Sequence, residues 1–140
     1  MHRMQTRMKG MDVFAFGIST APKSVRKLAE HYGFDYAAAD YYVFHQANMK
    51  MNSTIARKLK LDEARVPSSL RHFGNTSSAS IPLTIATQLR GKVEQQPTRF
   101  VCCGFGVGLS WGTVAFETNN LVLPPLVELD DSEACSNYVV

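Results

Sequence analysis

The chain has 140 residues, 45% of them hydrophobic and 19% charged, and a formal net charge of +3. This length supports one globular core and leaves no room for two independent domains. The small charge, without a Lys/Arg block, argues against a nucleic-acid-binding protein, and no apolar run is long enough to cross a membrane. The first ten residues are basic but contain no apolar segment typical of a signal peptide.

Cysteine usage indicates a reducing compartment. The three cysteines are Cys102, Cys103 and Cys135. Two of them are adjacent, none forms a CxxC pair, and no histidine spacing suggests zinc. We therefore expect a cytoplasmic protein without a disulfide framework or a metal site.

The first third of the chain predicts a short strand, a long helical region and a second strand. Residues 3–8 fit a short strand. Helical spacing then extends over 12–32, where Pro22 predicts a kink or two consecutive helices. Gly33 is placed to end this region. Residues 40–44 form an apolar strand that leads directly into the sequence HQAN.

Two further helices are predicted in the middle of the chain. Met51, Ile55 and Leu59 recur every four residues, which is typical of an amphipathic helix, here with a basic outer side. Residues 66–73 fit an irregular or extended stretch. A second helix is expected over 81–89 and should end near Gly91.

A hairpin and a tail complete the predicted order. Strands over 100–103 and 109–117 are joined by a glycine-rich loop, so we expect them to pair antiparallel. The alternation of strands and helices before them implies an α/β fold with a mostly parallel mixed sheet. Residues 121–140 drift from an apolar, proline-containing segment to a polar end, and we expect them to be partly disordered.

Three loops follow predicted strands and are candidates for a shared site: HQAN, FGNTSS and CGFGVGLSWG. In open α/β sheets, ligands bind where strand ends deliver their loops. His45 lies between a strand end and a helix start, where the helix dipole favours a neutral imidazole that can stabilise an oxyanion or enolate. For a histidine taken alone, a structural role is the commoner explanation.

The other two loops have equally ordinary explanations. Gly74 permits a tight turn that presents Asn75, but an asparagine here is also a suitable N-cap. The GFGVG loop lacks GxGxxG spacing, because Leu109 stands where the third glycine is required, so a dinucleotide site is not indicated. Its backbone N–H groups suit an oxyanion hole, and its glycines equally suit a sharp hairpin turn.

Taken together and in this order, HQAN, GNTSSAS and GFGVGLSWG resemble β-ketoacyl-acyl-carrier-protein synthase III, a thiolase-like condensing enzyme. The resemblance extends from about Met8 to Glu117 and corresponds to the C-terminal half of such an enzyme. It implies a half-domain over residues 1–120, with a five-stranded mixed sheet between helices, followed by the tail over 121–140.

The resemblance implies decarboxylative condensation of an acyl-CoA starter with malonyl-acyl-carrier protein in fatty acid biosynthesis, with no cofactor besides these substrates. His45 and Asn75 match the residues that stabilise the malonyl enolate. Implied partners are the acyl carrier protein, acyl-CoA, the N-terminal half of the same enzyme and a second copy in a homodimer. The other matching positions are Phe105, Gly106, Val107 and Gly108 in the closing and oxyanion loop; Gly10, Phe14, Ala47 and Asn48 along the pantetheine channel; and Lys50 facing the carrier protein.

The family's nucleophilic cysteine lies in its N-terminal half, which this sequence does not include. Cys102 falls where related thiolases carry an acid-base cysteine, but both adjacent cysteines lie in an apolar strand, where thiols are usually inert. We therefore expect this chain to be inactive alone. An isolated half should also expose a large apolar face and associate or dissolve poorly.

Two alternatives stay open. A chalcone-synthase-like polyketide enzyme also uses histidine, asparagine and a GFG loop, although HQAN and GNTSSAS followed by Ile-Pro fit synthase III better. A non-catalytic subunit that binds a carrier protein or scaffolds a partner is consistent with the missing cysteine, whereas His45 and Asn75 argue for chemistry.

Overall fold

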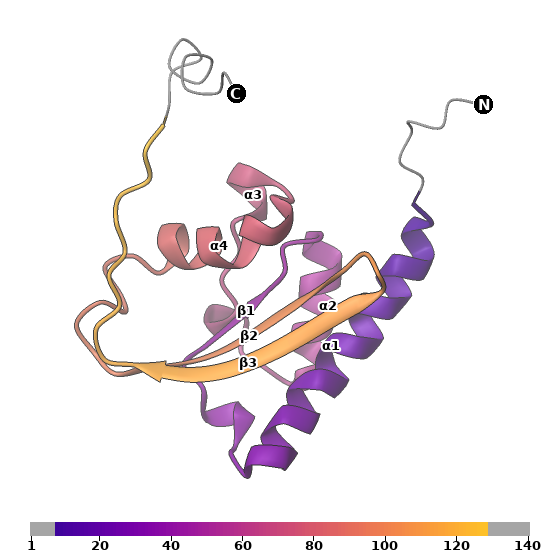
Figure 1. The fold of residues 1–140 in the computed structure, drawn as a ribbon, viewed down its shortest axis with the longest axis horizontal. Helices are drawn as coiled ribbons and strands as arrows, with labels where there is room; N and C mark the ends of the chain where they lie inside the picture. The colour runs from indigo at the N-terminus through magenta and orange to yellow at the C-terminus, as the bar shows by residue number, and fades with distance from the viewer. Residues whose placement is uncertain (1–7, 129–140) are drawn as a thin grey trace, which may run out of the picture.

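The structure, a computed structural model, describes residues 8–128. Three strands form one mixed sheet in the order β1–β2–β3. Helices α1 and α2 cover one face of the sheet and α4 covers the other (Figure 1). The strands are β1 (Tyr41–Phe44), β2 (Thr98–Gly106) and β3 (Ser110–Thr118); the helices are α1 (Gly10–Tyr32), α2 (Met49–Leu59), α3 (Leu70–Phe73) and α4 (Ser80–Gln88); short 3-10 turns are η1 (Tyr36–Ala38), η2 (Glu63–Arg65) and η3 (Ser77–Ala79).

Both faces of β1 and β2 are buried, and this explains their continuous apolar sequences. β1 pairs parallel with β2, placing Val43 opposite Cys102. Tyr42 and Phe44 pack into the cluster under α1 and α2, whereas Val43 packs into the cluster under α4. The predicted antiparallel pairing of the last two strands is confirmed, since β2 and β3 pair along their whole lengths.

Helix α1 runs without interruption through Pro22, so of the two predicted outcomes the break into two consecutive helices is wrong. A proline removes the hydrogen bond to the carbonyl four residues earlier, here that of Ile18. Lys58 Nζ donates to the Ile18 carbonyl oxygen at 2.9 Å and replaces the missing bond. Gly33 ends the helix as predicted, with φ of 66° and its N–H bonded to the Ala29 carbonyl.

Residues 8–128 contain a three-stranded sheet, not the predicted five strands. The strand predicted over 3–8 lies outside the described residues except for Met8, which is not in a strand. The stretch over 66–73, predicted to be irregular or extended, begins without helix or strand and ends in the short helix α3. Pro67 has no N–H to donate, and the Ser69 N–H bonds the Gln46 side chain at 3.2 Å, so this segment is held by a side chain instead of a strand.

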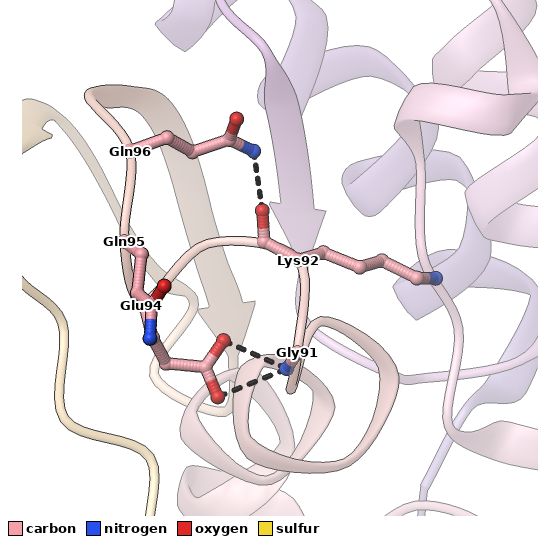
Figure 2. Close-up of a pocket in the computed structure, with 5 residues that line it drawn as sticks. All are labelled: Gly91, Lys92, Glu94, Gln95 and Gln96. Carbon is pink, nitrogen blue, oxygen red and sulfur yellow. Dashed lines mark hydrogen bonds between the residues drawn. The ribbon is translucent and has the colours of Figure 1, made fainter.

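The helix predicted over 81–89 is confirmed as α4, and a tight turn follows it. Gly91 has φ of 79°, a conformation that favours glycine. The Glu94 carboxylate accepts the Gly91 N–H at 2.7 and 2.9 Å, and the Gln96 amide donates to the Lys92 carbonyl (Figure 2). This turn reverses the chain from α4 toward β2. Residues 121–128, the described part of the predicted tail, contain neither helix nor strand.

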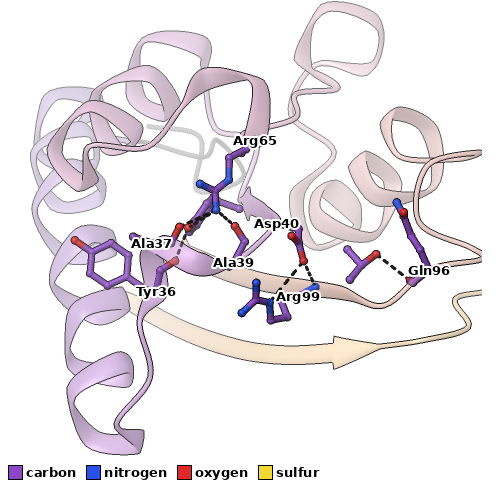
Figure 3. Close-up of polar contacts among 9 residues, drawn as sticks. Tyr36, Ala37, Ala39, Asp40, Arg65, Gln96 and Arg99 are labelled. Carbon is purple, nitrogen blue, oxygen red and sulfur yellow. Dashed lines mark hydrogen bonds and ion pairs between the residues drawn. The ribbon is translucent and has the colours of Figure 1, made fainter.

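Polar contacts hold the beginning of β1 in register with β2 (Figure 3). The Asp40 carboxylate accepts the Arg99 N–H at 2.7 Å and lies 3.8 Å from the Arg99 Nε. In the residues just before β1, the Ala37 and Ala39 carbonyl oxygens both accept hydrogen bonds from Arg65 Nη2, that of Ala37 at 2.7 Å. These contacts lie at the end of the strand opposite to HQAN, so they anchor the sheet without entering the candidate site.

Candidate functional site

The candidate site lies at the carboxyl end of β1, where HQAN leaves the sheet. The His45 N–H donates to the Cys103 carbonyl at 2.9 Å, which extends the pairing of β1 with β2 by one residue. Its imidazole Nδ1 lies 2.7 Å from the Ser80 Oγ at the start of α4. The Phe105 ring meets the imidazole edge to face, with 5.4 Å between centroids and an interplanar angle of 87°. Three segments therefore meet at one half-buried histidine.

Burial lowers the pKa of His45 below its ordinary value of 6.5, and a hydrogen bond with the Ser77 backbone acts in the opposite direction. The direction agrees with the neutral imidazole expected from the sequence. Its largest cause is desolvation by burial, which the sequence did not indicate. Helix α2 begins only at Met49, with Asn48 as its N-cap.

Asn75 lies in the turn that carries the chain from α3 to η3 and the start of α4. Gly74 has φ of 62°, and the Asn75 Oδ1 accepts the Ser77 N–H at 2.9 Å. This bond holds Ser77 in the left-handed region, with φ of 54°. Asn75 is thus a turn residue and not the N-cap of α4, whose N-cap is Ala79. Its side chain is exposed, and within residues 8–128 its Nδ2 donates to no group and no hydrogen bond joins it to His45.

The glycine-rich hairpin differs from the predicted loop. Gly104 and Gly106 belong to β2, and only residues 107–109 form the turn. Phe105 is a buried strand residue, whereas Val107 is 92% exposed at the turn and Gly108 has φ of 144°. The reason is that β2 and β3 continue their ladder as far as the pair of Gly106 with Ser110.

The residues expected along the pantetheine channel lie around the beginnings of α1 and α2. Gly10 is the first residue of α1, and Phe14 lies one turn later, with the Lys50 Nζ 6.0 Å from its ring centroid. Ala47 packs against the core cluster under these helices. Asn48 is exposed, but its Oδ1 is engaged by the Met51 N–H at 2.9 Å. The structure brings Phe14 and Lys50 together.

Sequence reasoning missed the residues that hold His45 in place. Gln46 is fully buried: its Nε2 donates to the Phe44 carbonyl at 2.7 Å, and its Oε1 accepts from the Ser68 Oγ and the Ser69 N–H. Ser80 and Thr84 are buried on the first turn of α4. The only available signals were the polar Gln46 after an apolar strand and the position of Ser80 at the end of the small-residue run.

Gly17 also helps to hold His45 in place, although the sequence did not indicate this. A Cβ at this position would lie 2.7 Å from the Met51 Sδ and 3.0 Å from the Phe105 ring. Because Gly17 has no side chain, α1 packs closely enough to support Phe105, which in turn contacts His45.

The two adjacent cysteines are buried, as predicted, on opposite faces of β2. Burial, with a smaller contribution from Cys103, raises the pKa of Cys102 to about 12. Burial also raises the pKa of Cys103. Both thiols are protonated near neutral pH, and a protonated thiol is a poor nucleophile.

Neither a metal cluster nor a membrane-spanning helix is found among residues 8–128. These residues contain no group of three or more His, Cys, Asp or Glu side chains that could hold a metal ion. None of the described helices is both long and apolar enough to span a bilayer.

Comparison with known families and proteins gives one consistent match. Residues 28–118 match the family described as 3-Oxoacyl-[acyl-carrier-protein (ACP)] synthase III C terminal. Beta-ketoacyl-[acyl-carrier-protein] synthase III of Synechococcus elongatus is 35% identical over 115 residues, which are 82% of this chain and 34% of that protein. Beta-ketoacyl-[acyl-carrier-protein] synthase III 2 of Streptomyces coelicolor is 38% identical over 109 residues, 77% of this chain and 33% of that protein.

Solved structures give the same result. The 3-oxoacyl-(acyl carrier protein) synthase III of Pseudomonas aeruginosa matches with a TM-score of 0.77 and 36% identity, over 83% of this chain and 36% of that chain. The priming beta-ketosynthase from the R1128 polyketide biosynthetic pathway matches with a TM-score of 0.74 and 27% identity, over 84% of this chain and 35% of that chain. The chain spans about a third of the length of the relatives it matches.

Proposed function

The chain belongs to the family of 3-oxoacyl-[acyl-carrier-protein] synthase III C-terminal domains, with part of their thiolase-like fold, and on this premise we propose that it is the decarboxylation half of a fatty-acid condensing enzyme. In the proposed reaction, a cysteine of an N-terminal half carries an acyl group from acyl-CoA. Malonyl-acyl-carrier protein loses CO₂, and the electrons of the broken C–C bond form an enolate. The enolate carbon attacks the acyl thioester, and the cysteine thiolate leaves.

His45 is the observation that carries this proposal. Decarboxylation places negative charge on the malonyl thioester oxygen, and a neutral donor in a water-poor site stabilises such a charge effectively. The His45 imidazole has a lowered pKa and fixed contacts with Ser80 and Phe105. The Asn75 side chain, whose Nδ2 has no acceptor within residues 8–128, is the second proposed donor to the same oxygen.

The hairpin would close the site over the reacting thioester. Phe105 contacts the imidazole directly, Gly106 ends β2, and Val107 and Gly108 follow at the exposed turn. We assign the Val107 N–H to the oxyanion hole for the acyl group, together with the N–H of the nucleophilic cysteine. This chemistry requires no resident cofactor, because the substrates supply both thioesters and the departing CO₂.

The substrate arm and the carrier protein would approach from the beginnings of α1 and α2. Lys50 is exposed and lies beside Phe14. A lysine there can attract an acidic carrier protein, while an aromatic ring can line the channel for the pantetheine arm. Gly10, Ala47 and Asn48 complete the proposed channel.

An N-terminal half and a second copy of the enzyme are the proposed structural partners. Apolar side chains on β3 support this assignment: Trp111 is 55% exposed, Val114 51% and Phe116 38%. The expected five-stranded sheet would then be completed by residues outside the described range. Two free, buried cysteines fit the cytoplasmic location that we propose.

Complementation tests the proposed function. We would co-express the full chain with a synthase III N-terminal half that carries its cysteine and assay condensation of acetyl-CoA with malonyl-acyl-carrier protein. We expect condensation that falls by about 100-fold or more in His45→Ala and in Asn75→Ala, because each removes a donor to the enolate. The exposed residues His31 and Asn119 provide matched controls, His31→Ala and Asn119→Ala, which should retain activity.

Two outcomes would favour other functions. A soluble complex that binds carrier protein without turnover would support a non-catalytic binding subunit, which the protonated cysteines of this chain also favour. Condensation with free malonyl-CoA in preference to malonyl-carrier protein would support a polyketide enzyme, a class that includes one of the matching structures.

A further inference from the structure

A chain of buried hydrogen bonds runs inward from His45, and its donor directions can be assigned. The Thr84 Oγ1 lies 2.7 Å from the Ser80 carbonyl oxygen, so Thr84 must donate there. The Ser69 Oγ lies 2.8 Å from the Thr84 Oγ1 and therefore donates to it. Ser69, Ser80 and Thr84 are all essentially inaccessible to water. Each buried hydroxyl proton thus needs an acceptor inside the protein.

Among the described residues, the Ser80 hydroxyl has one hydrogen-bond partner. Its Oγ lies 2.7 Å from the His45 Nδ1, and no other hydrogen bond of this oxygen occurs within residues 8–128. If Nδ1 carried a proton, the Ser80 hydroxyl would have to turn its own proton into the core without an acceptor, which is unfavourable. The Ser80 O–H therefore donates to Nδ1. A neutral imidazole that accepts at Nδ1 has its proton on Nε2.

We propose that Ser80 is the positioning residue of His45: its hydroxyl donates to Nδ1 and confines the ring proton to Nε2. This inference rests on the proposed function, because it identifies which nitrogen of His45 would donate to the enolate. The opposite tautomer would present a lone pair to a developing negative charge and would repel it. Ser80 thus favours the tautomer in which His45 can stabilise the charge.

The surrounding residues maintain this geometry. The Thr84 and Ser69 contacts fix the first turn of α4, and the Ser69 N–H bonds Gln46, the neighbour of His45 in the sequence. Phe105 packs edge to face against the imidazole and restricts its rotation. The serine donor and the histidine acceptor are therefore held by the same buried network.

The tautomer can be read directly by long-range ¹H–¹⁵N correlation spectra of the full chain labelled at histidine nitrogens. Signals of His45 are assigned by their loss in His45→Gln, since the chain has four histidines. Well above the ordinary histidine pKa of 6.5, we expect His45 to show the Nε2–H form alone. Ser80→Ala should produce a mixture of both tautomers, whereas Ser80→Thr, which retains a hydroxyl, should keep the native form.

Ser78→Ala is the matched control, because Ser78 is exposed, lies two residues away and makes no side-chain hydrogen bond within residues 8–128. The proposal is overturned by an Nδ1–H form in the native chain, or by unchanged His45 signals in folded Ser80→Ala. The native spectrum decides the question even where Ser80→Ala does not fold.

A kinetic measurement separates this inference from the proposed function. In the complemented enzyme, Ser80→Ala should lower kcat by about tenfold with little change in KM, and Ser80→Thr should restore it, because only the donor in the transition state is affected. The correct tautomer without any condensation would overturn the proposed function alone. Condensation by a chain with Nδ1–H at His45 would overturn the role of Ser80 alone.

Discussion

At the scale of single residues, His45 couples the candidate site to the stability of the fold. Burial lowers its pKa in the folded chain, whereas the unfolded chain titrates near 6.5. Above 6.5 both states are neutral and the native state keeps its full stability. As pH falls below 6.5, the unfolded state takes up the proton first, so stability decreases until the folded pKa is reached.

This pH dependence is a testable prediction. Denaturant unfolding at about pH 8 and about pH 5 should show a loss of unfolding free energy that is smaller in His45→Gln, in which this titration is absent. The exposed His31 supplies the matched control, His31→Gln, which should retain the native pH dependence. A His45 that titrates at or above 6.5 in the native chain would contradict the prediction.

At the scale of secondary-structure elements, Gln46 joins the end of β1 to the segment before α3. Its amide bonds the Phe44 carbonyl, the Ser68 hydroxyl and the Ser69 N–H. Gln46→Leu has a similar volume but would leave buried partners without hydrogen bonds. We expect a loss of about 2–4 kcal/mol in unfolding free energy, measured by denaturant titration.

The same substitution at an exposed glutamine shows whether the loss of stability comes from burial of Gln46 or from the change of residue type. Gln95 is exposed in the turn after α4, so Gln95→Leu should change the unfolding free energy by less than about 0.5 kcal/mol. A Gln46→Leu chain as stable as Gln95→Leu would show that the segment before α3 does not depend on this amide.

At the scale of the whole molecule, β3 presents apolar side chains that the helices leave partly exposed, although Trp111 contacts Phe16 of α1 edge to face. Trp111, Val114 and Phe116 are all more than a third exposed. An exposed apolar strand at a sheet edge promotes association. We therefore expect the isolated chain to self-associate at concentrations of about 100 μM in sedimentation experiments.

A charged side chain on β3 should prevent both self-association and assembly with an N-terminal half. Val114→Lys should raise the monomer fraction of the isolated chain and prevent assembly with an N-terminal half. Val122→Lys is the matched control, because Val122 is 79% exposed beyond the last strand and should affect neither. A monomeric native chain at the same concentration would disprove the interface.

The sequence by itself determined the local elements and the candidate chemistry. Periodic apolar residues predicted α2 and α4, Gly33 ended α1, and the glycine-rich loop predicted the hairpin. The three motifs together indicated the family that the comparisons then showed. These features were predictable because helix periodicity, capping and turn formation depend on neighbouring residues.

Only the tertiary structure decided how these elements support one another. Lys58 replaces the bond that Pro22 removes, Gln46 takes the place of a strand partner for Ser69, and Ser80 meets His45. Each contact joins segments far apart in the sequence, so no local pattern encodes it. The lowered pKa of His45 likewise arises from burial, which is a property of the packed chain and not of the residues beside it.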